Sequence, residues 1–182
     1  MQQTYKLKAA ILGLALATGL AWAAGVSAQD APALPGGASS LMETYGDWSV
    51  ACQSDQAAIR CAISQQQVQQ DGQRVVTIEL QTAPDDALAG NLVLPFGLQL
   101  DAGATLRIDE QPAMAPLRFH TCLPAGCVMG VSFDAATVTA LRAGTKLRVA
   151  TRTADTGQEF AIDISLNGFA SAIDRLKALT GP

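Results

Sequence analysis

Four cysteines and one histidine are the first residues of this chain to consider for nucleophilic, redox or metal chemistry. Cys122 and Cys127 enclose the tetrapeptide Leu-Pro-Ala-Gly, and Cys52 precedes Cys61 by a short polar stretch. A free thiolate could attack a carbonyl or bind zinc, whereas an oxidised pair would only cross-link two parts of the chain. The choice depends on the local turns and on the cellular compartment.

The spacing of the cysteines favours two local disulfides. Between Cys122 and Cys127, Pro124 fixes φ and Gly126 permits a positive φ, so the chain tends to reverse and bring the two sulfurs together. An even number of cysteines in an exported protein supports complete pairing. Three pairings are possible, and we predict Cys52 with Cys61 and Cys122 with Cys127, because each pair is close in sequence and flanked by strand-like residues.

Other chemistry has little support in the sequence. His120 is the only histidine, so a Ser-His-Asp or Cys-His system would need it beside a cysteine that we expect to be oxidised. Cys-x-x-Cys is absent, and disulfides would remove the thiolates that zinc prefers. We therefore predict no catalytic residue, no metal site and no cofactor, although carboxylates distant in sequence could still meet in a glycosidase-like cleft.

The N-terminus has the pattern of a secretory signal peptide. Lys6 and Lys8 precede an apolar run over residues 9–24, and Val26-Ser27-Ala28 offers small residues for cleavage after Ala28. The predicted organisation is a signal peptide over 1–28, a flexible linker over 29–43 that is rich in Pro, Gly and Ser, and one β domain over 44–180. No later apolar run approaches membrane-spanning length, so we expect no transmembrane segment after cleavage.

The charge balance limits the classes of partner. The whole chain has 12 Lys and Arg against 16 Asp and Glu, and removal of Lys6 and Lys8 changes the formal net charge from −4 to −6. Nucleic acids and anionic membrane surfaces are bound by clustered Lys and Arg. We therefore predict no nucleic-acid partner.

The elements that must position these residues are mostly strands. Val76, Ile78 and Leu80 alternate with polar residues, as do the runs 146–153 and 159–166, and Asp71-Gly72 signals a hairpin. The run 91–100 is interrupted by Pro95 and Gly97, which predicts an edge, bulged or broken strand. Five glutamines between residues 65 and 70 suggest an exposed strand edge.

Two short helices complete the predicted fold. Asp134 and Gly144 bracket a helix over 135–142, and apolar residues recur with helical spacing from Phe169 to Leu179. With about eight strands, the fold class is mainly β: an antiparallel sandwich or barrel-like domain with two short helices, one of them at the C-terminus. Trp48, on an alternating strand, is expected in the core.

Four stretches together resemble the invasion-associated locus B (IalB) family of exported bacterial proteins. They are Tyr45-Gly-Asp-Trp48 followed by Cys52, Cys122-Leu-Pro-Ala-Gly-Cys127-Val128, Leu141-Arg-Ala-Gly144, and residues 164–173 with the sequence Ile-Ser-Leu-Asn-Gly-Phe-Ala-Ser-Ala-Ile. The resemblance keeps its order over nearly all of the chain after residue 28. It implies a periplasmic or secreted β-rich domain and a family link to host-cell invasion.

The sequence favours a non-enzymatic interaction protein of the bacterial envelope. An exposed apolar tip made of Leu123, Pro124, Val128 and Met129 would dock onto another envelope protein or a host-surface protein; alternatively, these side chains are core. The expected location is the periplasm, with secretion or outer-membrane association as variants, and the oligomeric state is open. Other hypotheses are a periplasmic enzyme or enzyme inhibitor with a carboxylate-lined cleft, or a small-molecule carrier with a cavity between sheets.

Overall fold

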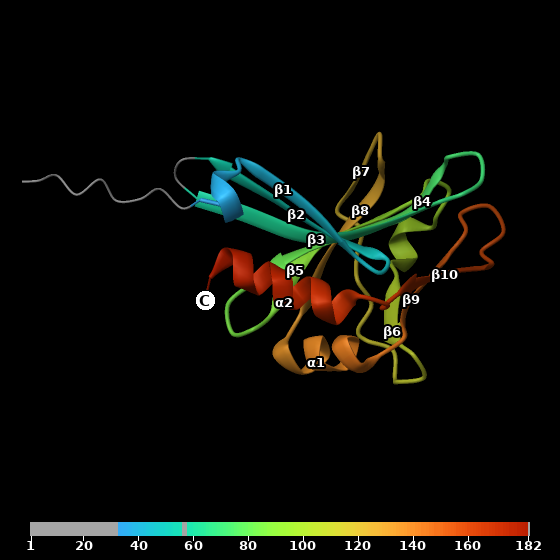
Figure 1. The fold of residues 1–182 in the computed structure, drawn as a ribbon. Helices are drawn as coiled ribbons and strands as arrows, with labels where there is room; N and C mark the ends of the chain where they lie inside the picture. The colour runs from blue at the N-terminus through green and yellow to red at the C-terminus, as the bar shows by residue number, and fades with distance from the viewer. Residues whose placement is uncertain (1–32, 56–57, 182) are drawn as a thin grey trace, which may run out of the picture.

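The structure is a computed structural model that describes residues 33–55 and 58–181. Two antiparallel sheets and a C-terminal helix enclose one hydrophobic core (Figure 1). The signal peptide predicted over 1–28 lies outside the described residues. Within the described ranges, no helix is both long and apolar enough to span a membrane.

The larger sheet has seven strands in the order β1-β2-β3-β4-β5-β8-β7, with β1 and β7 at its two edges. The strands are β1 (Ser40–Tyr45), β2 (Trp48–Asp55), β3 (Ala58–Val68), β4 (Arg74–Thr82), β5 (Leu88–Leu94), β7 (Thr121–Leu123) and β8 (Gly126–Phe133). The predicted alternation is confirmed in β4, where Val76, Ile78 and Leu80 are all buried. Trp48 is buried as predicted, and its ring packs edge-on against that of Phe169 at 4.9 Å.

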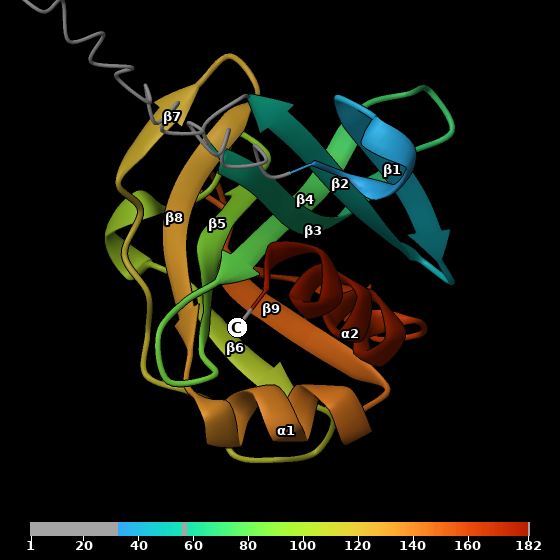
Figure 2. The ribbon, with the colours of Figure 1, turned by 60° about the vertical axis from the view of Figure 1, so that its left-hand side comes forward.

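The smaller sheet has the order β10-β9-β6 and is formed by β6 (Thr105–Ile108), β9 (Lys146–Arg152) and β10 (Glu159–Ser165). Helix α1 (Ala135–Ala143) begins at Asp134, whose carboxylate accepts a hydrogen bond from the Thr137 amide at 2.8 Å. Helix α2 (Phe169–Thr180) packs against β1–β4 of the larger sheet, and the two views show it lying across these strands (Figures 1 and 2). Two short 3-10 turns complete the fold, η1 (Pro35–Gly37) and η2 (Leu100–Ala102).

The prediction of a flexible linker over residues 29–43 is wrong from Leu34 onward. Leu34 is 2% exposed and belongs to the core, and Ser40 starts an edge strand whose partner is β2. Glu43 anchors this strand to α2, since its carboxylate pairs with both Nε and Nη2 of Arg175 at 2.7 and 2.8 Å. Burial alternates along β1, but Glu43 lies on its more buried side and Met42 is 78% exposed, so the residue types do not show the alternation that predicts a strand.

The prediction that the glutamine run forms an exposed strand edge is also wrong. It lies in β3, an internal strand between β2 and β4, and Gln65 is only 5% exposed. The Nε2 atoms of Gln65 and Gln67 donate to the carbonyl oxygens of Ser165 and Asp163, each at 2.9 Å. The amide side chains thus connect the larger sheet to β10 of the smaller one.

The interrupted run 91–100 is a broken strand, one of the three forms predicted for it. Strand β5 ends at Leu94, and after Pro95 and Gly97 the chain forms a single bridge from Leu98 to Thr153 beside the smaller sheet. The break allows one segment to contribute to both sheets. It also places Phe96 outside any strand.

Candidate functional site

The two predicted disulfides are present. Cys52 and Cys61 are direct partners in the β2–β3 pair, and Cys122 and Cys127 are direct partners in the β7–β8 pair. In the described part of the chain no cysteine is free. The bonds therefore fasten two neighbouring-strand pairs, and no thiolate is available for nucleophilic or metal chemistry.

The four residues predicted as an apolar tip separate in the structure. Leu123 is 51% exposed and Pro124 is exposed at the β7–β8 turn, whereas Val128 is half-buried further along β8. Met129 is wrong as a tip residue, because it points to the core side of β8 and is fully buried. Alternation along β8 explains the difference, since consecutive side chains face opposite sides of a sheet.

Exposed apolar side chains gather at the end of the larger sheet where β3 turns into β4, β5 ends and β7 turns into β8. A hollow of about 340 Å³ lies there, lined by residues 72–74, 95–96 and 124–126. Phe96 is 61% exposed beside it, and Leu123 precedes Pro124 in the turn. We call residues 72–74, 95–96 and 123–126 the hairpin-end surface.

The hairpin-end surface is held on well-fixed elements. The β7–β8 hairpin stands out from the body of the molecule in both views, and the Cys122–Cys127 bond closes its turn (Figures 1 and 2). Gly126 has a φ of 132°, and a Cβ there would lie 2.4 Å from the Leu94 carbonyl oxygen. This contact places the β7–β8 turn directly against the end of β5, just before Phe96.

Phe96 and Arg74 are members of this surface that sequence reasoning missed. A usable signal was present for Phe96, because an aromatic residue between Pro95 and Gly97 cannot continue an alternating buried face. Arg74 carries no such signal, since one basic residue at the start of a strand is ordinary. Its position beside Phe96 depends on how the strands assemble.

His120 is exposed on the segment before β7, and its backbone amide donates to the Val128 carbonyl at 2.8 Å. Its ring lies over Gly130, whose added Cβ would be 3.3 Å from the imidazole Cε1. Among residues 33–55 and 58–181, no three His, Cys, Asp or Glu side chains are grouped as a metal site requires.

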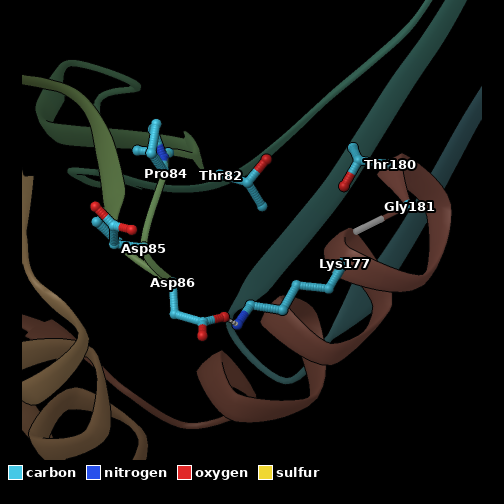
Figure 3. A pocket seen from close by; sticks show the side chains of 9 residues that line it. Thr82, Pro84, Asp85, Asp86, Lys177, Thr180 and Gly181 are labelled. Atoms are coloured by element: carbon cyan, nitrogen blue, oxygen red, sulfur yellow. Dashed lines mark hydrogen bonds and ion pairs between the residues drawn. The ribbon is translucent and has the colours of Figure 1, made fainter.

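A larger, open hollow of about 800 Å³ lies between the β4–β5 loop and the end of α2 (Figure 3). Asp85 and Asp86 line it, with φ values of 59° and 58°, a left-handed region that Asp tolerates better than most residues. Asp86 Oδ1 accepts from Lys177 Nζ at 2.6 Å, and this hydrogen bond lowers the pKa of Asp86. Figure 3 shows the Asp85 carboxylate turned away from Lys177.

This second hollow is the place to look for the carboxylate pair that a hydrolytic cleft would need. A general acid requires a carboxyl group whose pKa is raised, so that it still holds a proton near neutral pH. Asp86 has the opposite shift, and Asp85 does not converge with it. The arrangement is an ion pair that fastens the loop to α2.

Comparison with known proteins finds similar sequences over most of the chain. The family model described as invasion associated locus B (IalB) protein matches residues 48–177. An invasion protein B homolog of Brucella abortus (strain 2308) is 49% identical over 151 residues, which cover 82% of this chain and 87% of that protein. Invasion protein B of Bartonella bacilliformis is 34% identical over 148 residues, or 80% of each chain.

A solved structure is similar as well. The crystal structure of invasion associated protein B from Bartonella henselae superposes with a TM-score of 0.72 at 35% identity, covering 76% of this chain and 96% of that one. The family match extends from Trp48 in β2 to Lys177 in α2, and so includes both disulfides and the hairpin-end surface. The chain therefore belongs to the invasion associated locus B family.

Proposed function

We propose that the protein is exported and acts without catalysis, as a binding module of the bacterial envelope whose hairpin-end surface docks onto another protein. The observation that carries the proposal is the exposure of Phe96 and Leu123 on neighbouring turns of a disulfide-closed sheet end. Monomeric proteins rarely leave large apolar side chains together at the surface unless the surface binds something. Aromatic side chains in the centre of such a patch contribute much of the binding energy.

Export and an envelope location are supported by two independent features. The N-terminal residues have the charged, apolar and small-residue regions of a signal peptide, and both disulfides require an oxidising compartment to persist. We place the protein in the periplasm. Secretion and attachment at the outer membrane are the two other destinations that export across the inner membrane allows. The relatives named as invasion proteins make a host-surface protein a second candidate partner.

The experiment that tests this function is photo-cross-linking in the living bacterium. A benzophenone amino acid is placed at Leu123 in one variant and at Met42 in another, because Met42 is also highly exposed and lies in β1 at the opposite edge of the larger sheet. Irradiation should join the Leu123 variant to one specific polypeptide and leave the Met42 variant without that product. The same products from both positions, or none from Leu123, would refute docking through this surface.

A further inference from the structure

Most Lys and Arg side chains of this acidic protein form ion pairs with carboxylates, and three arginines do not. Of the ten in the described ranges, seven form ion pairs with Asp or Glu. The three without such a pair are Arg74, Arg118 and Arg152.

Arg74 belongs to the hairpin-end surface and lines the hollow that Phe96 and Pro124 also line. Arg152 is beside the segment that follows Phe96, because its carbonyl oxygen accepts from the Gln99 amide at 2.8 Å and the Ala154 amide donates to the Gly97 carbonyl at 2.8 Å. Arg118 is exposed elsewhere, with its Cα 3.9 Å from a Cβ added to Gly103.

Arg74 has one acidic residue in its own β3–β4 turn, Asp71, but the two form no ion pair. The Asp71 Oδ1 instead accepts a hydrogen bond from the Gln73 amide at 2.9 Å. The guanidinium of Arg152 donates to the Gly157 carbonyl at 2.9 Å, and Glu159 lies opposite Arg152 in the β9–β10 pair. Arg74 is the one charged residue among those that line the hollow beside Phe96, and it forms no ion pair with a carboxylate of the described residues.

We infer that the partner segment bound at the hairpin-end surface is an acidic polypeptide carrying an aromatic or long aliphatic side chain. The apolar side chain would enter the hollow beside Phe96, and a flanking carboxylate would pair with Arg74. The inference rests on the proposed function and specifies the chemistry of its partner. A membrane surface, the other anionic occupant, is disfavoured because anionic bilayers bind clusters of several Lys or Arg, and Arg74 is the one basic residue that lines this hollow.

The test follows amide resonances of the purified, isotope-labelled protein during titration with three short blocked peptides: Glu-Glu-Phe-Glu-Glu, Lys-Lys-Phe-Lys-Lys and Glu-Glu-Ala-Glu-Glu. Only the first combines acid with an aromatic ring. It should shift the amide resonances of residues 72–74, 96–97, 123 and 125–126, with affinity about tenfold or more above that of either other peptide. An equal response to the lysine peptide, shifts located elsewhere, or no response would overturn the inference.

Matched variants separate the contributions of charge and of the ring. Arg74→Glu and Phe96→Ser should each weaken the response to Glu-Glu-Phe-Glu-Glu about tenfold. Arg60→Glu and Met42→Ser should leave it unchanged, since Arg60 lies at the far end of β3 and Met42 in the opposite edge strand. An Arg60→Glu effect as large as that of Arg74→Glu would show that only overall charge matters and would overturn the inference.

Phosphatidylglycerol vesicles distinguish the competing occupant. Sedimentation with the vesicles that depends on Phe96 and Arg74 would overturn the polypeptide assignment in favour of a membrane, and no sedimentation supports the polypeptide. The failures are distinguishable: a cross-linked partner without discrimination between the peptides refutes the acidic segment alone. An absent cross-link at Leu123 refutes the proposed function itself.

Discussion

At the scale of single residues, the two disulfides differ in the access they give to a reductant. Both sulfur-bearing residues of the first pair are buried, with Cys52 2% and Cys61 6% exposed, whereas Cys122 is exposed and only its partner Cys127 is buried at 3%. Thiol–disulfide exchange requires an attacking thiolate to reach one sulfur along the bond axis. Cys122 is an exposed residue, so this bond is the one that a reductant can approach more easily in the folded protein.

We therefore predict that dithiothreitol opens the Cys122–Cys127 bond first. Native protein treated briefly with the reductant and then with iodoacetamide should be alkylated at Cys122 and Cys127, while Cys52 and Cys61 react only after denaturation. Peptide mass spectrometry measures the labelling. Equal labelling of all four cysteines under native conditions would show that burial does not protect the β2–β3 pair.

The residue scale also shows what sequence reasoning can reach. The disulfide pairing was predictable, because each pair is joined by a short segment with turn residues. The inclusion of Met129 in the tip was wrong because burial of one side of β8 depends on the register with β5, where Met129 lies opposite Leu92. Phe96 was missed for the converse reason, since its exposure results from three separate loops meeting at one end of the sheet.

At the scale of elements, the turn between β10 and α2 holds the two sheets together. Gly168 has a φ of 86°, and an added Cβ would lie only 1.9 Å from the Tyr45 carbonyl oxygen. The neighbouring Asn167 carbonyl accepts from the Asp47 amide at 3.1 Å, and the Ser165 carbonyl accepts from both Trp48 and Gln65. The β1–β2 turn and the β10–α2 turn thus pack backbone against backbone.

This packing predicts different costs for two glycine substitutions. Gly157 also has a positive φ, of 67°, but no atom lies within 4 Å of its added Cβ, so Gly157→Ala should lower the free energy of unfolding by only the conformational cost, about 1 to 2 kcal/mol. Gly168→Ala adds the clash with Tyr45 and should cost more than about 3 kcal/mol. Urea denaturation of the two variants measures the difference, and equal costs would show that the turns can separate freely.

Element type was easier to predict than element position. Strands β4, β9 and β10 and helices α1 and α2 follow from alternation, helical spacing and the Asp134 cap, all of which act over a few residues. Strand β1 and the burial of Gln65 could not be predicted in the same way. Both depend on distant partners, Arg175 in α2 for Glu43 and Ser165 in β10 for Gln65.

At the scale of the whole molecule, stability and binding are located in different places. Buried residues from both sheets, α1 and α2 form one core, while Phe96, Leu123 and Arg74 are exposed at one end of the larger sheet. Surface substitutions outside the core usually change the free energy of unfolding by less than about 0.5 kcal/mol. Variants of Phe96, Leu123 and Arg74 should therefore alter binding and leave the melting temperature nearly unchanged.

The central claim is that this surface supplies the energy for docking onto a protein partner. The most direct measurement is the yield of that partner after cross-linking in living cells and affinity purification of the tagged protein. Three forms are compared: the unchanged protein, a Phe96→Ser and Leu123→Ser double variant, and the control Met42→Ser. We expect the double variant to recover about tenfold less partner, or less still, at an unchanged melting temperature, with Met42→Ser like the unchanged protein. Equal recovery by all three forms would contradict the claim.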